Sequence, residues 1–403
     1  MTDMLKNKKI ILGVSGGIAA YKSIELLRLL TQQGADVRVL MTENACRFVG
    51  PLTFEALSGK AVCTHLFEDG RNARIGHIEW AKEAGAVVIA PATANIIGKI
   101  AGGIADDAVT TFLLAVTAPV LICPSMNTNM YQSPVVQRNL SLLAKDGHVI
   151  LEPDAGMLAC GVTGPGRLPE PDVILDRLLK VMRPQDLSGK RVLVTAGPTR
   201  EPIDPVRFLS NPSSGKMGFS IAGAAEKRGA RVTLVSGPCG IRDPYGVTVI
   251  RVQTAAQMAT AVFEHVDQAD IIIKSAAVSD YRPRDIATEK IKKEKDEMML
   301  TLVRNRDILA EIGQRKGSRF LVGFAAETES LDEHAAVKLA RKNLDMIVGN
   351  IVKGEFSAFG SDASRASFYY DDGTREALPM MDKESLAHRL LDRIVEKMPG
   401  LQR

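Results

Sequence analysis

Short apolar runs that end in glycine or small polar residues alternate with amphipathic stretches along this 403-residue chain. Residues 9–14 have the pattern of a buried strand, and the turn Ser15-Gly16-Gly17 follows them. Apolar residues then recur at helical spacing over residues 18–30. Gly34 ends this predicted helix, and residues 37–41 have the pattern of a second strand. A strand, a glycine turn, a helix and a strand form a βαβ unit, which indicates a parallel α/β domain.

The same order of elements begins again near Arg191. Residues 192–195 predict a strand, residues 218–228 a helix and residues 232–235 the next strand. Further buried-strand patterns occupy residues 86–90, 120–123, 248–252, 271–274, 320–324 and 345–349. We therefore predict an α/β fold of two doubly wound, Rossmann-like domains. The polar, Pro- and Gly-containing segment 182–189 is the expected join, which gives domains of residues 1–185 and 186–403.

Composition narrows the class of protein. Hydrophobic residues make up 45% and charged residues 24% of the chain, the balance of a soluble globular protein. Aromatic residues make up only 5%, and 51 basic against 47 acidic side chains leave a net charge of +4, which together argue against a nucleic-acid partner. A membrane span is not expected, because no apolar run reaches about 18 residues. Five scattered cysteines without a CxxC pair and no signal-peptide pattern predict a cytoplasmic protein with reduced thiols.

Several polar motifs follow the predicted strands of the first half. The turn at residues 15–18 can present backbone N–H groups to an anion, although it is not a GxGxxG motif and alone is equally typical of an ordinary βα turn. Pro-Ala-Thr-Ala-Asn at 91–95 and Pro-Ser-Met-Asn-Thr-Asn-Met-Tyr at 124–131 each follow a strand. Gly-His-Ile-Glu at 76–79 and Ala-Cys-Gly at 159–161 complete the set.

In this order, these motifs resemble the homo-oligomeric flavin-containing cysteine decarboxylases over residues 5–180. The resemblance implies a flavodoxin-like domain that binds FMN between subunits. The implied FMN residues are Ser15, Gly16, Gly17 and Ile18 for the phosphate, with Thr42, Glu43, Thr93 and Asn95, and with Asp107 and Thr110 as further FMN or subunit contacts. Tyr131 departs from the family, whose motif often ends in Trp, but it keeps an aromatic face.

The implied reaction oxidises the thiol of 4'-phosphopantothenoylcysteine, releases carbon dioxide and re-reduces the product to 4'-phosphopantetheine. His77 is the candidate base, since an imidazole with a pKa near about 6.5 suits proton removal at neutral pH. Asn127 is expected to hold the substrate carboxylate, with Met126 shaping the pocket, and Cys160 to protonate the product on a Gly- and Pro-rich flap at residues 154–167. Without the resemblance, His77 would pass for a surface histidine and Asn127 for a helix cap.

The second half contains a long loop, residues 195–218, between a strand and a helix, where about 2–6 residues are usual. It ends in Ser-Ser-Gly-Lys at the helix start, which again suits an anion, but it is not a Walker A motif. Ala-Ala-Val-Ser-Asp-Tyr at 276–281, Glu-Lys-Ile-Lys-Lys at 289–293, Gly-Phe-Ala-Ala-Glu-Thr at 323–328 and Lys-Asn-Leu-Asp at 342–345 follow.

From about residue 188 to the end, these runs resemble the phosphopantothenate–cysteine ligase family. The resemblance implies that CTP and Mg²⁺ convert 4'-phosphopantothenate to an acyl-cytidylate, which the amine of cysteine then attacks. Lys290 is the candidate that stabilises activation, Asp280 the candidate for Mg²⁺ or nucleotide, and Arg207 and Asn211 the candidates for phosphopantothenate or the acyl-cytidylate. The implied CTP residues are Lys274, Ser275, Ala276, Asp280, Lys290, Arg306, Asp307, Ile308, Leu309, Phe324, Lys338 and Lys342.

Two of these residues depart from the family. Arg306 stands where the family commonly has Pro, and Lys274 replaces a smaller residue at the end of its strand. Without the resemblance, Lys290 belongs to a solvated basic run, and Lys338 and Lys342 to an exposed helix face on which they lie one turn apart.

Other function classes fit the pattern less well. A dinucleotide-dependent oxidoreductase lacks support, since both GxGxxG and an acidic ribose-binding residue after residues 37–41 are missing. A regulatory flavoprotein would not need His77, Asn127, Cys160 and Lys290 together. Peptide-cysteine decarboxylases and flavin prenyltransferases share the first fold, but the attached ligase half selects coenzyme A biosynthesis. The family implies a homo-oligomer with a dimeric ligase half, and the strictness of CTP over ATP stays open.

Overall fold

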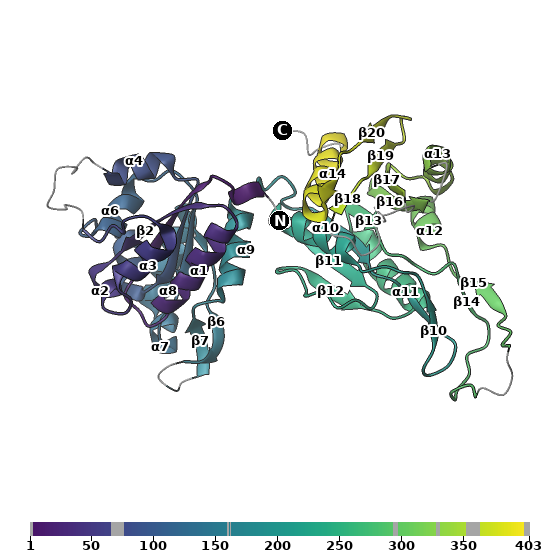
Figure 1. Cartoon of the computed structure of the whole chain (residues 1–403), viewed down its shortest axis with the longest axis horizontal. Helices are drawn as coiled ribbons and strands as arrows, with labels where there is room; N and C mark the ends of the chain where they lie inside the picture. The colour runs from purple at the N-terminus through teal and green to yellow at the C-terminus, as the bar shows by residue number, and fades with distance from the viewer. Residues whose placement is uncertain are drawn as a thin grey trace. The chain divides into compact units, whose positions relative to one another are not determined.

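The computed structural model describes residues 3–65, 76–158, 161, 163–292, 297–327, 331–351 and 363–398. The chain divides between Pro184 and Gln185 into two compact units, each with its own sheet and core (Figure 1). We call them the N-terminal unit and the C-terminal unit.

Within the described residues, the N-terminal unit contains a parallel sheet of five strands in the order β2-β1-β3-β4-β5. The strands are β1 (Lys9–Val14), β2 (Asp36–Met41), β3 (Ala86–Ala92), β4 (Val120–Pro124) and β5 (Val149–Ile150). All residues of β3 and β4 are buried. Strands covered on both faces need apolar residues at every position, which explains why these segments are continuous apolar runs without alternation.

Helices cover both faces of this sheet. Buried side chains of α1 (Ala20–Gln32), α3 (Pro51–Ser58) and α9 (Pro171–Val181) form one core with the sheet. Those of α4 (Gly76–Glu83), α5 (Ala94–Ala101), α6 (Ala108–Ala115) and α8 (Pro134–Lys145) form the other. The remaining elements are η1 (Asp3–Leu5), α2 (Glu43–Cys46), α7 (Thr128–Gln132) and the antiparallel pair β6 (Asp154–Met157) and β7 (Thr163–Arg167). The β6–β7 hairpin occupies the segment expected to be an irregular flap.

The C-terminal unit has a larger sheet, in the order β12-β11-β8-β13-β16-β17-β19-β20 over its described part. The strands are β8 (Arg191–Ala196), β11 (Arg231–Ser236), β12 (Thr248–Arg251), β13 (Ile271–Lys274), β16 (Phe320–Glu327), β17 (Met346–Ile351), β19 (Ser367–Tyr370) and β20 (Arg375–Ala377). The strands from β12 to β17 are parallel, and β19 and β20 add an antiparallel edge.

Two helix layers enclose this sheet as well. The helices α10 (Lys216–Lys227) and α14 (Lys383–Lys397) pack on one face, and α11 (Ala255–His265), α12 (Ile308–Gln314) and α13 (Leu331–Lys342) pack on the other. Short pairs complete the unit: β9 (Arg200–Pro202) with β10 (Phe208–Ser210), β14 (Tyr281–Pro283) with β15 (Leu302–Arg304), and β18 (Ala363–Ser364) with β21 (Met381–Asp382). The 3₁₀ turn η2 (Val266–Gln268) follows α11. The loop expected to lack regular structure, residues 195–218, therefore holds the β9–β10 hairpin.

Both sheets are doubly wound, which confirms the predicted fold class. The strand order reverses between β1 and β3 in the first sheet and between β8 and β13 in the second. Ligands of open α/β sheets bind beside such reversal points, at the carboxyl ends of the strands. The polar motifs found in the sequence follow these ends.

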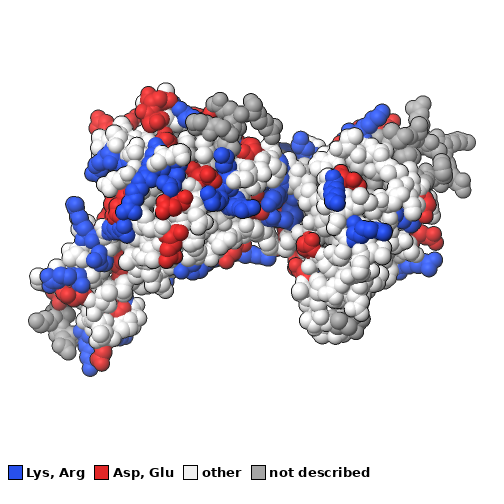
Figure 2. All heavy atoms as spheres, turned by 180° about the vertical axis from the view of Figure 1, so that it is seen from behind, with Lys and Arg blue, Asp and Glu red and all other residues white. Residues whose placement is uncertain are grey.

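The surface agrees with a small net charge. On the face shown in Figure 2, basic and acidic side chains are interspersed over both units. None of the described helices combines the length and the apolarity that crossing a bilayer requires.

Candidate active sites

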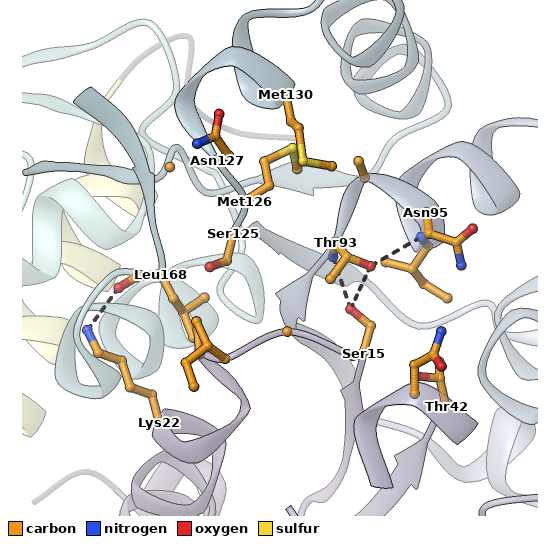
Figure 3. A pocket seen from close by; sticks show the side chains of 18 of the residues that line it. Ser15, Lys22, Thr42, Thr93, Asn95, Ser125, Met126, Asn127, Met130 and Leu168 are labelled. Carbon is orange, nitrogen blue, oxygen red and sulfur yellow. Dashed lines mark hydrogen bonds between the residues drawn. The ribbon is translucent and has the colours of Figure 1, made fainter. Parts of the chain in front are cut away.

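A cavity of about 970 Å³ opens at the carboxyl ends of β1, β3 and β4 in the N-terminal unit (Figure 3). The segments that follow these strands and β2 form its walls, together with part of the β6–β7 hairpin. The candidate residues that line it are Ser15, Gly16, Gly17, Ile18, Thr42, Glu43, Thr93, Asn95, Asp107, Met126 and Asn127. Thr110 is buried and forms the capping box of α6 with Asp107, so its hydrogen bonds fix the position of Asp107.

The buried Ser15 hydroxyl joins two of the walls. Its Oγ lies 2.8 Å from the Pro91 carbonyl oxygen and 3.2 Å from Thr93 Oγ1, and it accepts a 3.0 Å hydrogen bond from the Thr93 N–H. Thr93 in turn caps α5 through the N–H of Ile96. The turns after β1 and β3 therefore hold each other in place (Figure 3).

The turn between β1 and α1 has no room for a side chain at Gly16, whereas a Cβ at Gly17 would make an ordinary contact. A Cβ atom on Gly16 would lie 2.4 Å from the Asn44 Cβ, and one on Gly17 would lie 3.4 Å from a methyl carbon of Thr93. No side chain caps the N-terminus of α1, whose cap position is Ala19. A bare glycine turn at a helix start is a cradle for a phosphate group. These residues fit the phosphate of a flavin mononucleotide.

The motif after β4 packs against the β6–β7 hairpin. The Met126 N–H donates to the Gly166 carbonyl (3.0 Å), and a Cβ on Gly166 would lie 2.2 Å from the Met126 carbonyl oxygen. Asn127 caps α7, with its Oδ1 accepting from the Asn129 N–H at 2.8 Å. Asn127 can cap α7 and also bind a ligand from the cavity wall, because the oxygen of its carboxamide serves the cap while the NH₂ group can donate to a ligand.

Two catalytic candidates lie outside the described residues in part or in full. His77 belongs to α4, but its side chain is not among those described. Cys160 falls between β6 and β7, where residues 159, 160 and 162 are outside the described ranges. Leu158, which lines the cavity, accepts a 2.9 Å hydrogen bond from the Gly161 N–H in the same turn. The roles of His77 and Cys160 stay predictions.

The cavity is also lined by charged residues that the sequence motifs did not predict. Lys22 is buried, and its Nζ donates to the Leu168 carbonyl at 3.0 Å and to Glu170 at 2.8 Å. Lys99 bridges Asp106 (2.7 Å) and Asp107 (3.1 Å). Lys99 follows Asn95 by one helical turn, so helical spacing could have placed it on the cavity side.

Tyr131, the departure from the family's Trp, is anchored by its hydroxyl. The ring is nearly buried, and the hydroxyl donates a short hydrogen bond to the Glu152 carboxylate. Burial and the neighbouring Glu152 raise the pKa of Tyr131 to about 12. The phenol therefore stays protonated and ties α7 to the segment after β5.

In the C-terminal unit, cationic side chains gather beside the carboxyl ends of β13 and β16. The Lys342 Nζ lies 2.8 Å from Asp307 Oδ2, and the Lys338 Nζ donates to the Phe324 carbonyl at 3.1 Å. Asp307 also caps α12 by accepting from the Ala310 N–H at 3.1 Å. Ile308 and Leu309, also predicted for the nucleotide, are buried at the start of α12. We call Lys274, Lys338 and Lys342 the lysine cluster.

Lys274 reaches this group from the end of β13. Side chains alternate along a strand, so it faces the same helix layer as the buried Ile272. Burial lowers the pKa of the half-buried Lys274 to about 8, and the ammonium groups of Lys342 and Lys338 add to this effect against Asp307 and Asp280.

The Asp307 carboxylate responds to the same neighbours. Burial alone would raise the pKa of Asp307, but its hydrogen bonds from Lys342 and the Ala310 N–H, with the charges of Lys342 and Lys274, lower it. The cluster is therefore an electropositive site with Asp307 ionised.

Other ligase candidates lie on neighbouring segments. Lys290 is exposed, and the segment that carries it is bonded to the loop before β10, where the Arg207 Nη1 donates to the Ile291 carbonyl at 3.3 Å. Asn211 Nδ2 donates to the Val278 carbonyl at 3.3 Å, beside the Ser275–Ala276 turn. The exposed Asp280 accepts the Asn305 N–H at its carbonyl.

Arg306 contacts residues of α11 and α12. Its guanidinium lies 4.3 Å from the centre of the Phe263 ring on α11, and its Nε donates to Glu311 at 2.6 Å. The described contacts of Arg306 thus anchor α12 to α11, which is a structural role that the sequence did not indicate.

Known proteins show the same two-part organisation. Residues 1–183 match the family model described as Flavoprotein, and residues 187–398 match that of the DNA/pantothenate metabolism flavoprotein C-terminal domain. The chain is 49% identical over 395 residues to the coenzyme A biosynthesis bifunctional protein CoaBC of Bacillus subtilis (strain 168), covering 97% of both chains. This chain belongs to the family of bifunctional coenzyme A biosynthesis proteins.

Two solved structures each match about half of this family member. A C-terminal domain of a coenzyme A biosynthesis bifunctional protein CoaBC is 42% identical, with a TM-score of 0.45, and covers 52% of this chain and 96% of its own. The FMN-dependent cysteine decarboxylase SpaF is 33% identical, with a TM-score of 0.39, and covers 43% of this chain and 96% of its own.

Proposed function

We propose that the chain catalyses two reactions of coenzyme A biosynthesis. The C-terminal unit joins 4'-phosphopantothenate to cysteine with CTP, and the N-terminal unit decarboxylates the resulting 4'-phosphopantothenoylcysteine. The observation that carries this proposal is the full-length match to bifunctional coenzyme A biosynthesis proteins, combined with a flavin-type cavity lined by the candidate residues of the first half. The product of the ligase is the substrate of the decarboxylase, which gives a reason for their fusion.

FMN is the proposed resident cofactor of the N-terminal unit. Ser15, Gly16, Gly17 and Ile18 would hold its phosphate, and Thr42, Thr93 and Asn95 would border the rest. When bound, FMN supplies the two-electron oxidation of the substrate thiol and the later return of the hydride.

The chain's own residues provide binding and proton transfer. In this proposal His77 removes a proton from the substrate, and the Asn127 carboxamide binds the carboxylate that departs as carbon dioxide. Met126 packs beside the substrate on the cavity wall. Cys160, which lies outside the described residues, protonates the product in this proposal.

The ligase reaction needs positive charge where the phosphates lie. The substrate carboxylate attacks the α-phosphate of CTP and pyrophosphate leaves; the amine of cysteine then attacks the acyl carbon of the acyl-cytidylate, loses a proton and displaces CMP. The lysine cluster, Lys290 and Arg207 supply cations for these anionic groups. Asn211 would orient the acyl group beside the turn after β13.

Mg²⁺ would accompany the nucleotide, not occupy a protein cage. Among the described residues, no three His, Cys, Asp or Glu side chains gather as a metal site. Mg²⁺ in nucleotide sites commonly takes one or two carboxylates with phosphate oxygens and water. The exposed Asp280 suits this arrangement.

The flavin cavity also suggests a homo-oligomer. Several apolar side chains around it are exposed: Ile18 (64%), Tyr21 (53%), Met130 (49%) and Met157 (73%). Exposed apolar groups around a cavity are typical of a protein interface. We propose that subunits meet at the flavin sites, that the ligase half is dimeric, and that the protein works in the cytoplasm.

Two substitutions separate the proposed sites. His77→Asn is expected to abolish carbon dioxide release from supplied 4'-phosphopantothenoylcysteine and to leave pyrophosphate release by the ligase unchanged. Lys290→Gln is expected to have the opposite effect. Both variants are compared at equal flavin content and equal oligomer size. Decarboxylation at the normal rate in His77→Asn would contradict the assignment of the base.

A further inference from the structure

A buried carboxylate in the loop between β9 and β10 has more partners than its own turn requires. Asp204 is only 2% exposed. Its Oδ1 accepts hydrogen bonds from the Val206 N–H (2.8 Å) and the Arg207 N–H (2.7 Å), which close the local turn. This arrangement, with an aspartate accepting from residues two and three positions ahead, is a common way to stabilise a turn.

The second oxygen of the same carboxylate makes long-range bonds. Oδ2 accepts from the Ile291 N–H and from Arg207 Nη1, each at 3.2 Å. The same Arg207 Nη1 donates to the Ile291 carbonyl at 3.3 Å. The carboxylate, the guanidinium and the backbone N–H and carbonyl of Ile291 thus form a closed ring of hydrogen bonds between positions 87 residues apart.

Ile291, the residue that this ring connects to Asp204, directly follows Lys290 in the chain. Lys290 is itself exposed and lies in a segment without helix or strand structure. The Ala287 N–H, bonded to the Ile203 carbonyl at 3.0 Å, provides a second link between the same two segments. The position of the Lys290 backbone therefore depends on the Asp204 loop.

The carboxylate is ionised in this setting. Burial raises the pKa of Asp204, but the N–H groups of Val206, Arg207 and Ile291 and the charge of Arg207 outweigh it and hold the pKa below its usual range. Both oxygens consequently accept hydrogen bonds at neutral pH.

We propose that Asp204 is a positioning residue of the ligase reaction, which through Oδ2 holds the Lys290 segment and the Arg207 guanidinium in one arrangement. This inference rests on the proposed roles of Lys290 and Arg207 in the ligase. A cation stabilises a transition state only when it is held where charge develops, and a misplacement of about 1 Å can reduce a rate about 100-fold.

Asp204→Asn distinguishes the two oxygens. The amide oxygen can keep accepting from the turn, while its NH₂ group faces two donors, the Ile291 N–H and Arg207, and cannot accept from them. We expect kcat for pyrophosphate release to fall by about 30-fold in the full-length protein, with KM for CTP within about threefold of its normal value. Decarboxylation of supplied 4'-phosphopantothenoylcysteine stays unchanged.

Asp382→Asn is the matched control. Asp382 Oδ1 accepts from the N–H groups of Glu384 (3.1 Å) and Ser385 (3.0 Å), with the same spacing as at Asp204, and Oδ2 accepts from the Ser385 hydroxyl (2.7 Å). Asp382 caps α14 and has no proposed role in either reaction. Its substitution should reproduce any loss of stability but leave the ligase rate within about twofold. An equal fall in kcat in both variants would refute the inference.

A second substitution at the same position keeps the test usable if Asp204→Asn does not fold. Asp204→Ser retains one oxygen for the turn N–H groups and removes the second, so it should give the same fall in kcat. Normal kcat in a folded Asp204→Asn or Asp204→Ser variant would overturn the proposal.

A double-mutant cycle separates this inference from the proposed function. If Asp204 acts through Lys290 as well as Arg207, the fall in kcat caused by Asp204→Asn should be clearly smaller in the Lys290→Gln background than in the unchanged protein, because only the contribution through Arg207 remains. Losses that multiply would refute the positioning role and leave the role of Lys290 standing. A normal rate for Lys290→Gln alone would refute the role of Lys290 itself, and the inference with it.

Discussion

Lys274 provides a direct test of the nucleotide site, because it is one of the predicted CTP residues and joins the lysine cluster from β13. Lys274→Met removes its charge and keeps an unbranched side chain of similar length. We expect Lys274→Met to bind CTP more weakly with little change in kcat, since the phosphate charge that Lys274 faces is present before and after activation. Lys274→Arg is the control that keeps the charge.

The size of the effect follows from the half-buried position of Lys274. A unit charge about 4 Å from another contributes up to about 4 kcal/mol at an effective dielectric constant near 20, whereas exposed pairs contribute about 0–1 kcal/mol. A partly screened ammonium near phosphates should contribute about 1–2 kcal/mol. This corresponds to a rise of about 5- to 30-fold in the Kd for CTP.

The pKa of Lys274 adds a pH signature. With a pKa of about 8 in the free protein, Lys274 is charged below pH 8 and increasingly neutral above it. Phosphates favour the charged form, so bound CTP raises this pKa and binding takes up a proton above pH 8. The affinity for CTP should therefore be highest below pH 8 and fall as the pH rises through it.

Calorimetric titration of CTP between pH 7 and 9.5 measures both effects. The unchanged protein should lose affinity above pH 8, and Lys274→Met should be weaker throughout and lack that step. Lys274→Arg should bind well and also lack the step, because a guanidinium stays charged. If Lys274→Met also lost affinity above pH 8, or if its Kd for CTP at pH 7 lay within about twofold of that of the unchanged protein, Lys274 would not be the group that binds the phosphates.

Three further predictions concern the N-terminal unit. Gly16→Ala should lower the flavin content of the purified protein at least about tenfold, because the new Cβ would lie 2.4 Å from the Asn44 Cβ. The flavin content is measured from the flavin absorbance after gel filtration, and a content equal to that of the unchanged protein would contradict the proposed phosphate site. Cys160→Ala should release carbon dioxide but accumulate an oxidised product, detected by mass spectrometry, and normal 4'-phosphopantetheine formation would contradict its role as proton donor. Tyr131→Phe should lower the melting temperature of the unit by about 2–4 °C through loss of the bond to Glu152, with carbon dioxide release retained, and an unchanged melting curve would count against the anchor.

Much of the fold was predictable because buried parallel strands carry continuous apolar runs. The segment 271–274 was predicted as a strand with the bounds that β13 has. The predicted strand at 320–324 continues to Glu327 as β16, since pairing with β17 extends beyond the most apolar residues.

The two segments without periodicity were harder to predict. Residues 154–167 and 195–218 contain short antiparallel pairs that the sequence pattern did not indicate. Strands of three to five residues rich in Gly and Pro are stabilised by contacts with other segments, such as the bond from the Met126 N–H to Gly166. Local sequence does not encode such contacts.

The candidate sites show the same limit. Ser15 and Thr93, which lie in two motifs that each follow a strand, were predicted from the family resemblance of those motifs. Asp204 was not found, because its importance arises from bonds to a residue 87 positions away. Arg306 was predicted for the nucleotide from the family resemblance, and its contact with the Phe263 ring, 43 positions earlier in the chain, was not indicated by the sequence.

The most direct test of the central claim is one assay of the purified, full-length protein. Its visible spectrum is recorded first, and it is then supplied with 4'-phosphopantothenate, cysteine, Mg²⁺ and either CTP or ATP while pyrophosphate and carbon dioxide are measured. If both proposed activities are correct, the protein is yellow and releases both products with CTP. Pyrophosphate without carbon dioxide would contradict the decarboxylase assignment, and a folded, flavin-loaded protein that releases neither product would contradict both activities.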